Sequence, residues 1–166
     1  MKLFAWIAVF VAAGFGTAGT ASAQAFGSSA AVVGDEVLFG QAQTDREPGA
    51  VFVFRRVGEG WERTAKFSAS DGFVGNGFGS FVVADDDVVA VSAPNADEGR
   101  GAVYLYRRSD DGAWNETARL TAPGLAEGAT LGIEMGMKDG LLLAATADAD
   151  SATGSVHAFR RSGDGW

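Results

Sequence analysis

The sequence contains no cysteine and a single histidine. Without cysteine no disulfide framework can form, so packing alone must hold the fold, and no cysteine near residue 23 offers a lipid-acylation site. The histidine, His157, stands at an interior position of an apolar segment without a serine, cysteine or paired aspartate beside it, and we interpret it as a packing residue. The chain also lacks a nucleophile elbow, an HExxH motif and a phosphate-binding glycine loop.

Basic residues are also scarce. The chain has 13 lysines and arginines against 21 aspartates and glutamates, which gives a net charge of −8. An acidic surface argues against nucleic acid and against anionic membrane surfaces as partners. It is compatible with a solvated, exported protein.

The only long apolar run lies at the N-terminus. Lys2 supplies a positive start, Leu3 to Ala13 is apolar throughout, and Ala21-Ser22-Ala23 fits a signal peptidase. We predict that residues 1–23 are a secretory signal cleaved before Gln24, which makes the protein secreted, periplasmic or attached to the cell surface, without stable membrane insertion. The alternative is an uncleaved anchor, but the apolar part is shorter than the about 20 residues that a span needs.

One apolar segment recurs three times. Gly49–Arg56, Gly101–Arg108 and Gly154–Arg161 each run from a small residue through β-branched and aromatic residues to a double arginine, at spacings of 52 (101 − 49) and 53 (154 − 101) residues. This composition and length favour a strand. Because Val51 to Phe54 are apolar at every position, the pattern predicts a strand that is buried on both faces.

Further landmarks recur in register. They are Phe26-Gly27, Phe78-Gly79 and Leu131-Gly132, and the tryptophans Trp61, Trp114 and Trp166. In the second copy we expect strands at residues 78–84, 88–93, 101–108 and 114–121, with a polar loop at 95–99. Four short strands in about 52 residues match one blade of a β-propeller. A β-sandwich would leave the strict repeat unexplained, and a parallel β-helix would need much shorter coils.

These landmarks resemble the FG-GAP repeat, the blade of integrin α-type β-propellers, in its bacterial calcium-free variety. Phe26-Gly27 and Phe78-Gly79 match its first element, whereas Leu131-Gly132 departs from it. The second element is degraded in all copies, as Gly40-Gln41-Ala42, Ser92-Ala93-Pro94 and Ala145-Thr146-Ala147.

The resemblance covers residues 26–166 and implies an all-β fold of propeller blades. Blade 1 would span 26–77, blade 2 78–130 and blade 3 131–166, which stops before its last strand. We therefore expect under three blades of a larger propeller, a fragment whose remaining blades belong to the same full-length chain. Glycines 27, 79 and 132 would stand where neighbouring blades crowd, and the residue before each would fill the gap between blades.

No catalytic, metal-binding or cofactor-binding residue is predicted. The hairpin turns lack the alternating oxygens of a calcium loop. Three pairs at i and i+2 remain candidates for a weak cation, with turn capping as the simpler alternative: Gln43/Asp45, Asn95/Asp97 and Asp148/Asp150. The double arginines would either form a stripe for a sulfated or carboxylated ligand or pair with turn carboxylates, which is simpler.

The function that we expect is an extracellular module that binds a protein or a glycan, as in adhesion, without enzymatic activity. The alternative is the propeller scaffold of an exported lyase or hydrolase whose site lies in missing blades. Propellers host both kinds of function, so the fold does not decide between them.

Overall fold

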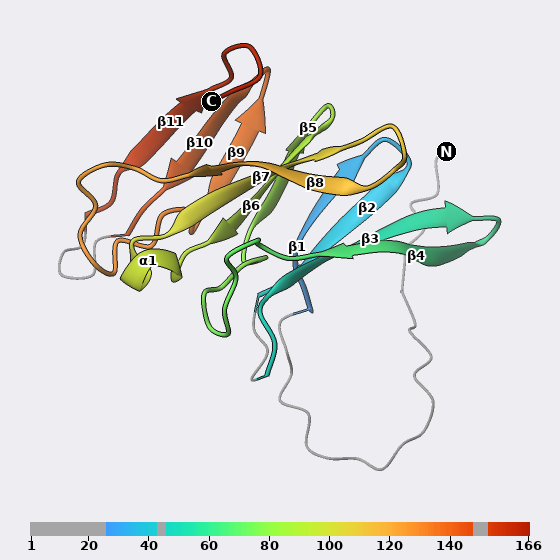
Figure 1. Cartoon of the computed structure of the whole chain (residues 1–166), viewed down its shortest axis with the longest axis horizontal. Coiled ribbons are helices and arrows are strands. Elements are labelled where there is room, and N and C mark those ends of the chain that lie inside the picture. Colours follow the sequence, from blue (N-terminus) through green and yellow to red (C-terminus); the bar gives the residue numbers. More distant parts are fainter. Residues whose placement is uncertain (1–25, 43–45, 148–152) are drawn as a thin grey trace, which may run out of the picture.

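The computed structural model describes residues 26–42, 46–147 and 153–166, which form three antiparallel sheets (Figure 1). The first sheet holds β1 (Phe26–Val33), β2 (Glu36–Gln41), β3 (Ala50–Val57) and β4 (Gly60–Phe67). The second holds β5 (Val82–Asp85), β6 (Val88–Ala93), β7 (Ala102–Arg108) and β8 (Trp114–Leu120). The third holds β9 (Met135–Lys138), β10 (Leu141–Ala145) and β11 (Val156–Arg160). One helical turn, α1 (Ala96–Gly99), lies between β6 and β7. The all-β prediction is confirmed.

The first two sheets repeat each other in detail. In both, the third and fourth strands pair with a register shift, between Val53 and Phe54 in the first sheet and between Leu105 and Tyr106 in the second. A threonine on the fourth strand contacts the carbonyl at this irregularity, Thr64 Oγ1 at 3.5 Å from Val53 O and Thr117 Oγ1 at 3.2 Å from Leu105 O. The irregularity is therefore part of the repeat, and each threonine hydroxyl satisfies a carbonyl there.

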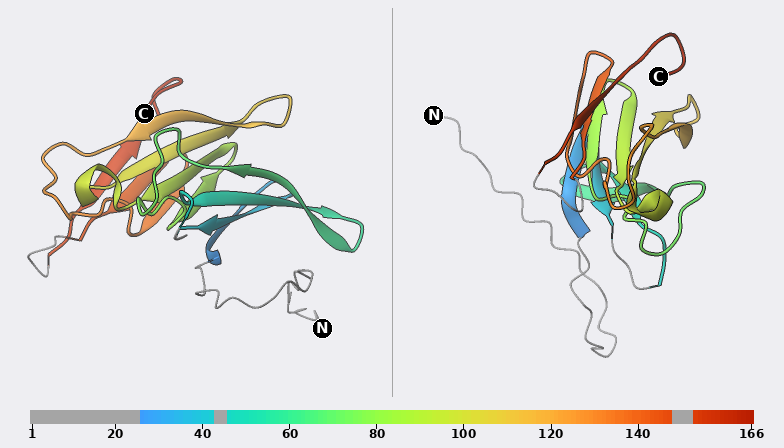
Figure 2. Two further views of the ribbon diagram at one scale, coloured as in Figure 1. Left: turned by 60° about the horizontal axis from the view of Figure 1, so that its bottom comes forward. Right: turned by 90° about the vertical axis from the view of Figure 1, so that its left-hand side faces the viewer.

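Two apolar layers hold the three sheets together. The second sheet lies between the first and the third in Figure 1 and in the left-hand view of Figure 2. The layer between the first and second sheets includes Val51 and Val53 on one side and Tyr104 and Tyr106 on the other. The layer between the second and third sheets joins the aliphatic side of the second sheet to Leu142 and Ala144. The first strands of the first and second sheets, β1 and β5, are also in contact, because Ser29 Oγ accepts a hydrogen bond from Val82 N at 2.7 Å.

Only the middle copy of the repeated strand is buried on both faces. In β7 the five residues from Ala102 to Tyr106 are all buried, whereas Phe52 and Phe54 in β3 are half-buried and β11 alternates between exposed and half-buried residues. The prediction that the recurring strand is buried on both faces was therefore wrong for β3 and β11. The reason is that the second sheet alone has a described neighbour on each face.

The first strand of the second copy begins later than predicted. β5 starts at Val82 and not at Phe78. The Asn76 side chain accepts a hydrogen bond from Phe78 N at 3.0 Å, and Gly79 has a φ of 92°, so the backbone bends here before the strand begins. The polar loop expected at 95–99 contains α1, where Asp97 and Glu98 have positive φ.

The predicted crowding at the repeated glycines is present at two positions. A Cβ on Gly79 would lie 2.9 Å from Ala50 O, and one on Gly132 would lie 2.6 Å from Ser92 Cβ, in each case an atom of the preceding sheet. A Cβ on Gly27 would meet only Phe39, at 3.8 Å. Phe78 and Leu131 fill the gaps between sheets and are fully buried, whereas Phe26 is 46% exposed.

The predicted signal segment, residues 1–23, lies outside the described residues. In the described part of the chain, no helix has the length and hydropathy to cross a membrane.

Candidate functional site

The two ends of the sheets differ. One end, the hairpin end, carries tight turns such as that between β5 and β6. The other, the loop end, carries the long connections 68–81, 94–101 and 121–134, and α1 marks it in Figure 1. Because loops tolerate more variation than strands, the loop end is the first place to seek a binding surface.

At the hairpin end, the first arginine of the first two pairs contacts its own sheet. Arg55 Nη2 lies 2.8 Å from Glu36 Oε1, and its Nε lies 3.1 Å from Asp35 Oδ2 without the alignment of a hydrogen bond. Arg107 Nη2 lies 3.4 Å from Asp87 Oδ2 in the second sheet.

The second arginine reaches the hairpin of the preceding sheet. Arg108 Nη2 lies 3.6 Å from Glu36 Oε1, and Arg161 Nη1 lies 3.8 Å from Asp87 Oδ1. These contacts join the first sheet to the second and the second sheet to the third. They support pairing with turn carboxylates over a ligand-binding stripe.

Glu36 is the buried member of this set, with 3% of its side chain exposed. Thr64 Oγ1 adds a contact to its Oε1 at 3.4 Å, while Oε2 has no hydrogen-bond partner among the described atoms. Removing one partner of a buried ion pair leaves the other charges uncompensated. Glu36 therefore has a structural task between two sheets.

A pocket of about 430 Å³ opens at the hairpin end between the second and third sheets. Val88 lines it at the position that Glu36 occupies in the first sheet, since Val88 faces Arg107 as Glu36 faces Arg55. The shorter side chain leaves space that the glutamate fills one sheet earlier. Arg161 and Trp166 also line the pocket. Among the described residues, no group of three or more His, Cys, Asp or Glu side chains could hold a metal ion.

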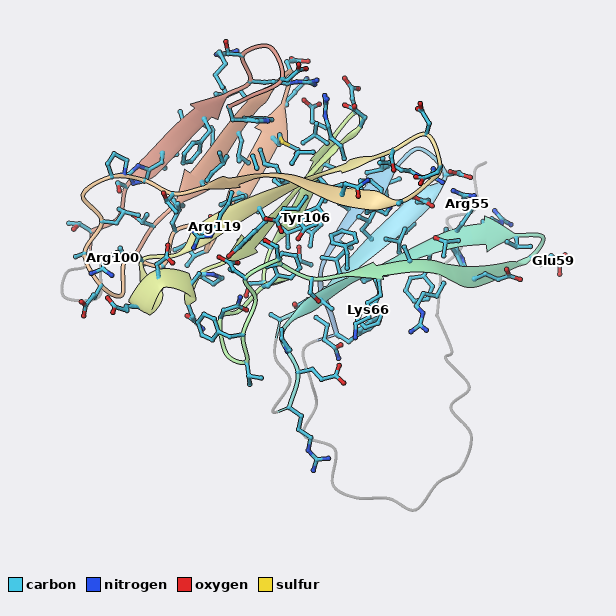
Figure 3. The ribbon with its side chains drawn as sticks, viewed as in Figure 1. Arg55, Glu59, Lys66, Arg100, Tyr106 and Arg119 are labelled. Atoms are coloured by element: carbon cyan, nitrogen blue, oxygen red, sulfur yellow. The ribbon has the colours of Figure 1, made fainter. Side chains whose placement is uncertain are left out.

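At the loop end, a polar network joins the connection between the first two sheets to β7 and β8 (Figure 3). The Tyr104 hydroxyl donates to Asp71 Oδ1 at 2.6 Å. Arg119 Nε lies 3.0 Å from Asp71 Oδ2, and Arg119 Nη2 donates to Asp97 Oδ1 at 2.7 Å. Asp97, a candidate for a weak cation, thus pairs with an arginine.

A second set of contacts fixes the same connection three residues earlier. The Tyr106 hydroxyl lies 2.9 Å from Ser68 O and 3.1 Å from Glu116 Oε2. Ser70 donates to Glu116 through both its backbone N and its hydroxyl, each at 2.9 Å. Residues 68–77, the anchored loop, are therefore held at two points, and between its anchors and β5 the loop exposes Phe73 (52%) and Val74 (47%).

The anchored loop lies within the segment that a known family matches. Residues 61–106 match the family model of the FG-GAP repeat. The matched segment runs from β4 of the first sheet to β7 of the second, so it spans the anchored loop and the boundary between two sheets. The comparison with curated proteins finds no match.

The other residues singled out in the sequence have local partners or lie outside the described residues. Asn95 Nδ2 donates to Gly75 O at 3.0 Å, and His157 Nε2 lies 3.0 Å from Ser155 Oγ. Four candidates fall on residues that the structure does not describe: Gln43, Asp45, Asp148 and Asp150. Sequence reasoning missed the anchors of the loop at Asp71 and Glu116. Asp71 is the one carboxylate of residues 68–77, whereas Glu116 stands on β8, 46 residues after Ser70, so no local pattern of the sequence marks the two anchors.

Both tyrosines of the repeat are shielded from ionisation. Burial, reinforced by the hydrogen bond to Asp71 and opposed by Arg119, raises the pKa of Tyr104 from 10.0 to about 12. Burial and the neighbouring Glu116 raise the pKa of Tyr106 further. Burial lowers the pKa of Arg119, but the hydrogen bonds to Asp97 and Tyr104 outweigh it and raise that pKa overall.

We expect the folded protein to show almost no tyrosinate at pH 10 to 11, because its only two tyrosines are Tyr104 and Tyr106. Unfolded chains ionise near pH 10, so in this range the folded state binds more protons. The contribution of the two tyrosines to the free energy of unfolding is therefore fully present below pH 10, and it falls as the pH rises towards 12. Ultraviolet absorbance of tyrosinate, read in buffer and in urea, checks this. Equal titration curves would show that the network does not exist in solution.

Proposed function

We propose that this chain is part of an exported β-propeller that binds a protein or a glycan outside the cytoplasm through the loop end of its blades. The observation that carries the proposal is the anchored loop, which holds Phe73 and Val74 exposed on a doubly fixed backbone. Large apolar side chains exposed on a loop are candidates for the buried centre of an interface.

Preorganisation supports binding at this place. A loop that is already fixed loses little conformational entropy when a partner docks, so more of the contact energy appears as affinity. The neighbouring loops are also fixed to each other, because Arg100 contacts Glu98 at 2.7 Å and Glu127 at 3.1 Å. Arg100 lowers the pKa of Glu98, so this carboxylate stays charged.

The charges around the exposed residues favour a partner with basic or hydroxyl groups. Asp71, Asp97 and Glu127 lie on the connections 68–81, 94–101 and 121–134 of the loop end, and each is at least 45% exposed in spite of its ion pair. A binding role fits this surface better than catalysis, because its carboxylates contact arginines that hold the loops together.

We expect the double variant F73S/V74S to lose at least about tenfold in affinity for the partner, since two exposed apolar anchors would be removed. The test screens the exported protein against arrays of glycans and of extracellular protein domains, then titrates the strongest binder with each variant. Val57→Ser is the matched control, because Val57 is 49% exposed but lies at the hairpin end. Equal affinity of F73S/V74S and the wild type, or no binder on either array, would overturn the proposal.

A further inference from the structure

The pocket at the hairpin end lies between the second and third sheets, at the end of the sheets opposite α1 (Figure 1). Its volume of about 430 Å³ exceeds the roughly 30 Å³ of one water molecule and falls in the range of small-molecule pockets, about 300–1,000 Å³. Its walls come from the β5–β6 hairpin, the β9–β10 hairpin and the segment that follows β11. The two hairpins are fixed to each other, because Gly140 N donates to Asp85 Oδ2 at 2.9 Å.

Trp166, which also lines the pocket, repeats Trp114 of the second sheet. Each of these tryptophans packs against the apolar layer between its own sheet and the preceding one. After Trp114 the chain runs along β8 towards the loop end, because Trp114 pairs with Arg108 and Leu120 pairs with Val103. A chain that continued after Trp166 in the same way would also leave the hairpin end, and the pocket would stay open.

The equivalent place between the first and second sheets is filled by Glu36. Its Oε1 lies 2.8 Å from Arg55 Nη2 and 3.6 Å from Arg108 Nη2, and 3% of its side chain is exposed. Asp35 Oδ2 lies 3.1 Å from Arg55 Nε and supplies a second carboxylate. At this boundary two arginines therefore meet two carboxylates.

Between the second and third sheets the two equivalent arginines share one carboxylate. Arg161 lines the pocket, and Arg107 pairs in register with Val88, which lines it in place of the glutamate. Arg107 Nη2 lies 3.4 Å from Asp87 Oδ2 and Arg161 Nη1 lies 3.8 Å from Asp87 Oδ1. Each distance is longer than the corresponding contact with the glutamate, and no other described carboxylate forms an ion pair with either arginine. One carboxylate is therefore missing at this boundary.

The rim of the pocket carries the opposite charge. Asp86 and Asp139 stand in the two hairpin turns and line the pocket, and both are exposed. Within the described part of the chain, neither carboxylate has an ion pair or a hydrogen bond. Val88 and Met137 add apolar surface to the walls. A ligand with a carboxylate alone would be repelled by the rim, whereas a ligand that also carries an ammonium group would be attracted by it.

We infer that this pocket binds a small zwitterion of the amino-acid class. The carboxylate of the ligand pairs with Arg161 and Arg107, as that of Glu36 pairs with two arginines one sheet earlier. The ammonium group of the ligand faces Asp86 and Asp139. Ion pairs that are also hydrogen bonds are the strong polar contacts of binding sites, and arginine is suited to carboxylates. The pocket lies at the opposite end of the sheets from the anchored loop, so this inference is independent of the proposed function.

Three small probes test the inference by isothermal titration calorimetry of the full chain at neutral pH and low salt. β-Alanine carries a carboxylate and an ammonium group, whereas propionate and propylamine carry one each on the same three-carbon chain. We expect β-alanine to bind at least about tenfold more tightly than either of the others, because it alone satisfies both charges of the pocket. Equal affinity of β-alanine and propionate, equal affinity of β-alanine and propylamine, or no binding of β-alanine at millimolar concentration would overturn the inference.

Variants locate the binding in the pocket. Arg161→Gln should weaken β-alanine by at least about tenfold, since it removes the guanidinium that lines the pocket. Val88→Glu should abolish binding, because the chain's own carboxylate then takes the ligand's place; Val88→Gln fills the same space if circular dichroism shows that Val88→Glu does not fold. Arg56→Gln is the matched control, because Arg56 repeats Arg161 but its Nε donates to Gly58 O in its own hairpin at 3.3 Å. Binding of β-alanine to Arg161→Gln with the affinity of the wild type, or an equal loss in Arg56→Gln, would contradict the assignment to this pocket.

Discussion

Replacing Gly101 by alanine should destabilise the protein by more than about 4 kcal/mol, a loss that few single substitutions reach. A Cβ at this position would clash with Leu131 N and would lie 2.6 Å from Leu131 O. Both are backbone atoms of the segment that enters the third sheet, so no side-chain rotation can relieve the clash. The neighbouring hydrogen bond from Leu131 N to Arg100 O, at 3.0 Å, would also break.

Gly124→Ala is the matched control for this prediction. Gly101 and Gly124 have nearly the same φ, 84° and 79°, but a Cβ on Gly124 would meet no atom within 4 Å. Alanine in the left-handed region costs about 1–2 kcal/mol, which both variants share. Urea unfolding followed by tryptophan fluorescence measures the difference between them. Similar midpoints for the two variants would show that Leu131 does not approach Gly101 in solution.

The repeat and its strands could be predicted from the sequence because they depend on local patterns. β-branched and aromatic runs placed β3, β6 and β7 to within a residue or two, and the Asp-rich turn before Val88 falls between β5 and β6. Gly79 and Gly132 were placed correctly as points of close approach, since a residue without a side chain at a constant offset marks a site where another backbone comes near.

The polar contacts between sheets could not be predicted in the same way. Arg108 meets Glu36 across 72 residues (108 − 36), and its partner depends on how two sheets are rotated against each other. The same holds for Tyr106 and Ser68, which are 38 residues apart. The start of β5 was misplaced for a related reason, because the Asn76 side chain competes with strand pairing for Phe78 N.

The segment that matches the FG-GAP repeat spans the boundary between the first and second sheets and does not lie within one sheet. Residues 61–106 take the last strand of the first sheet and three strands of the second. This segment includes Phe67, Phe78, Tyr104 and Tyr106, which contact one another between the sheets. The unit therefore holds most of one interface between sheets, in keeping with stability that comes from neighbouring repeats.

Replacing Phe78 by alanine should cost about 3–5 kcal/mol, the usual range for a buried phenylalanine. Phe78 is fully buried, and its ring centroid lies 5.5 Å from that of Tyr104 and 6.0 Å from that of Tyr106. The cavity would open between the first and second sheets, beside both tyrosines that hold the anchored loop. We therefore expect the tyrosinate absorbance to rise at lower pH in this variant.

Phe26→Ala tests whether the cost arises from the neighbouring sheet. Phe26 occupies the same position of the repeat, but it is 46% exposed and its ring stacks with rings of its own sheet. Its replacement should cost about 1 kcal/mol, because only part of the ring is removed from water. Urea unfolding of both variants gives the comparison. A loss for Phe26→Ala as large as that for Phe78→Ala would mean that Phe26 is packed as closely as Phe78 in solution, and that the neighbouring sheet does not account for the cost.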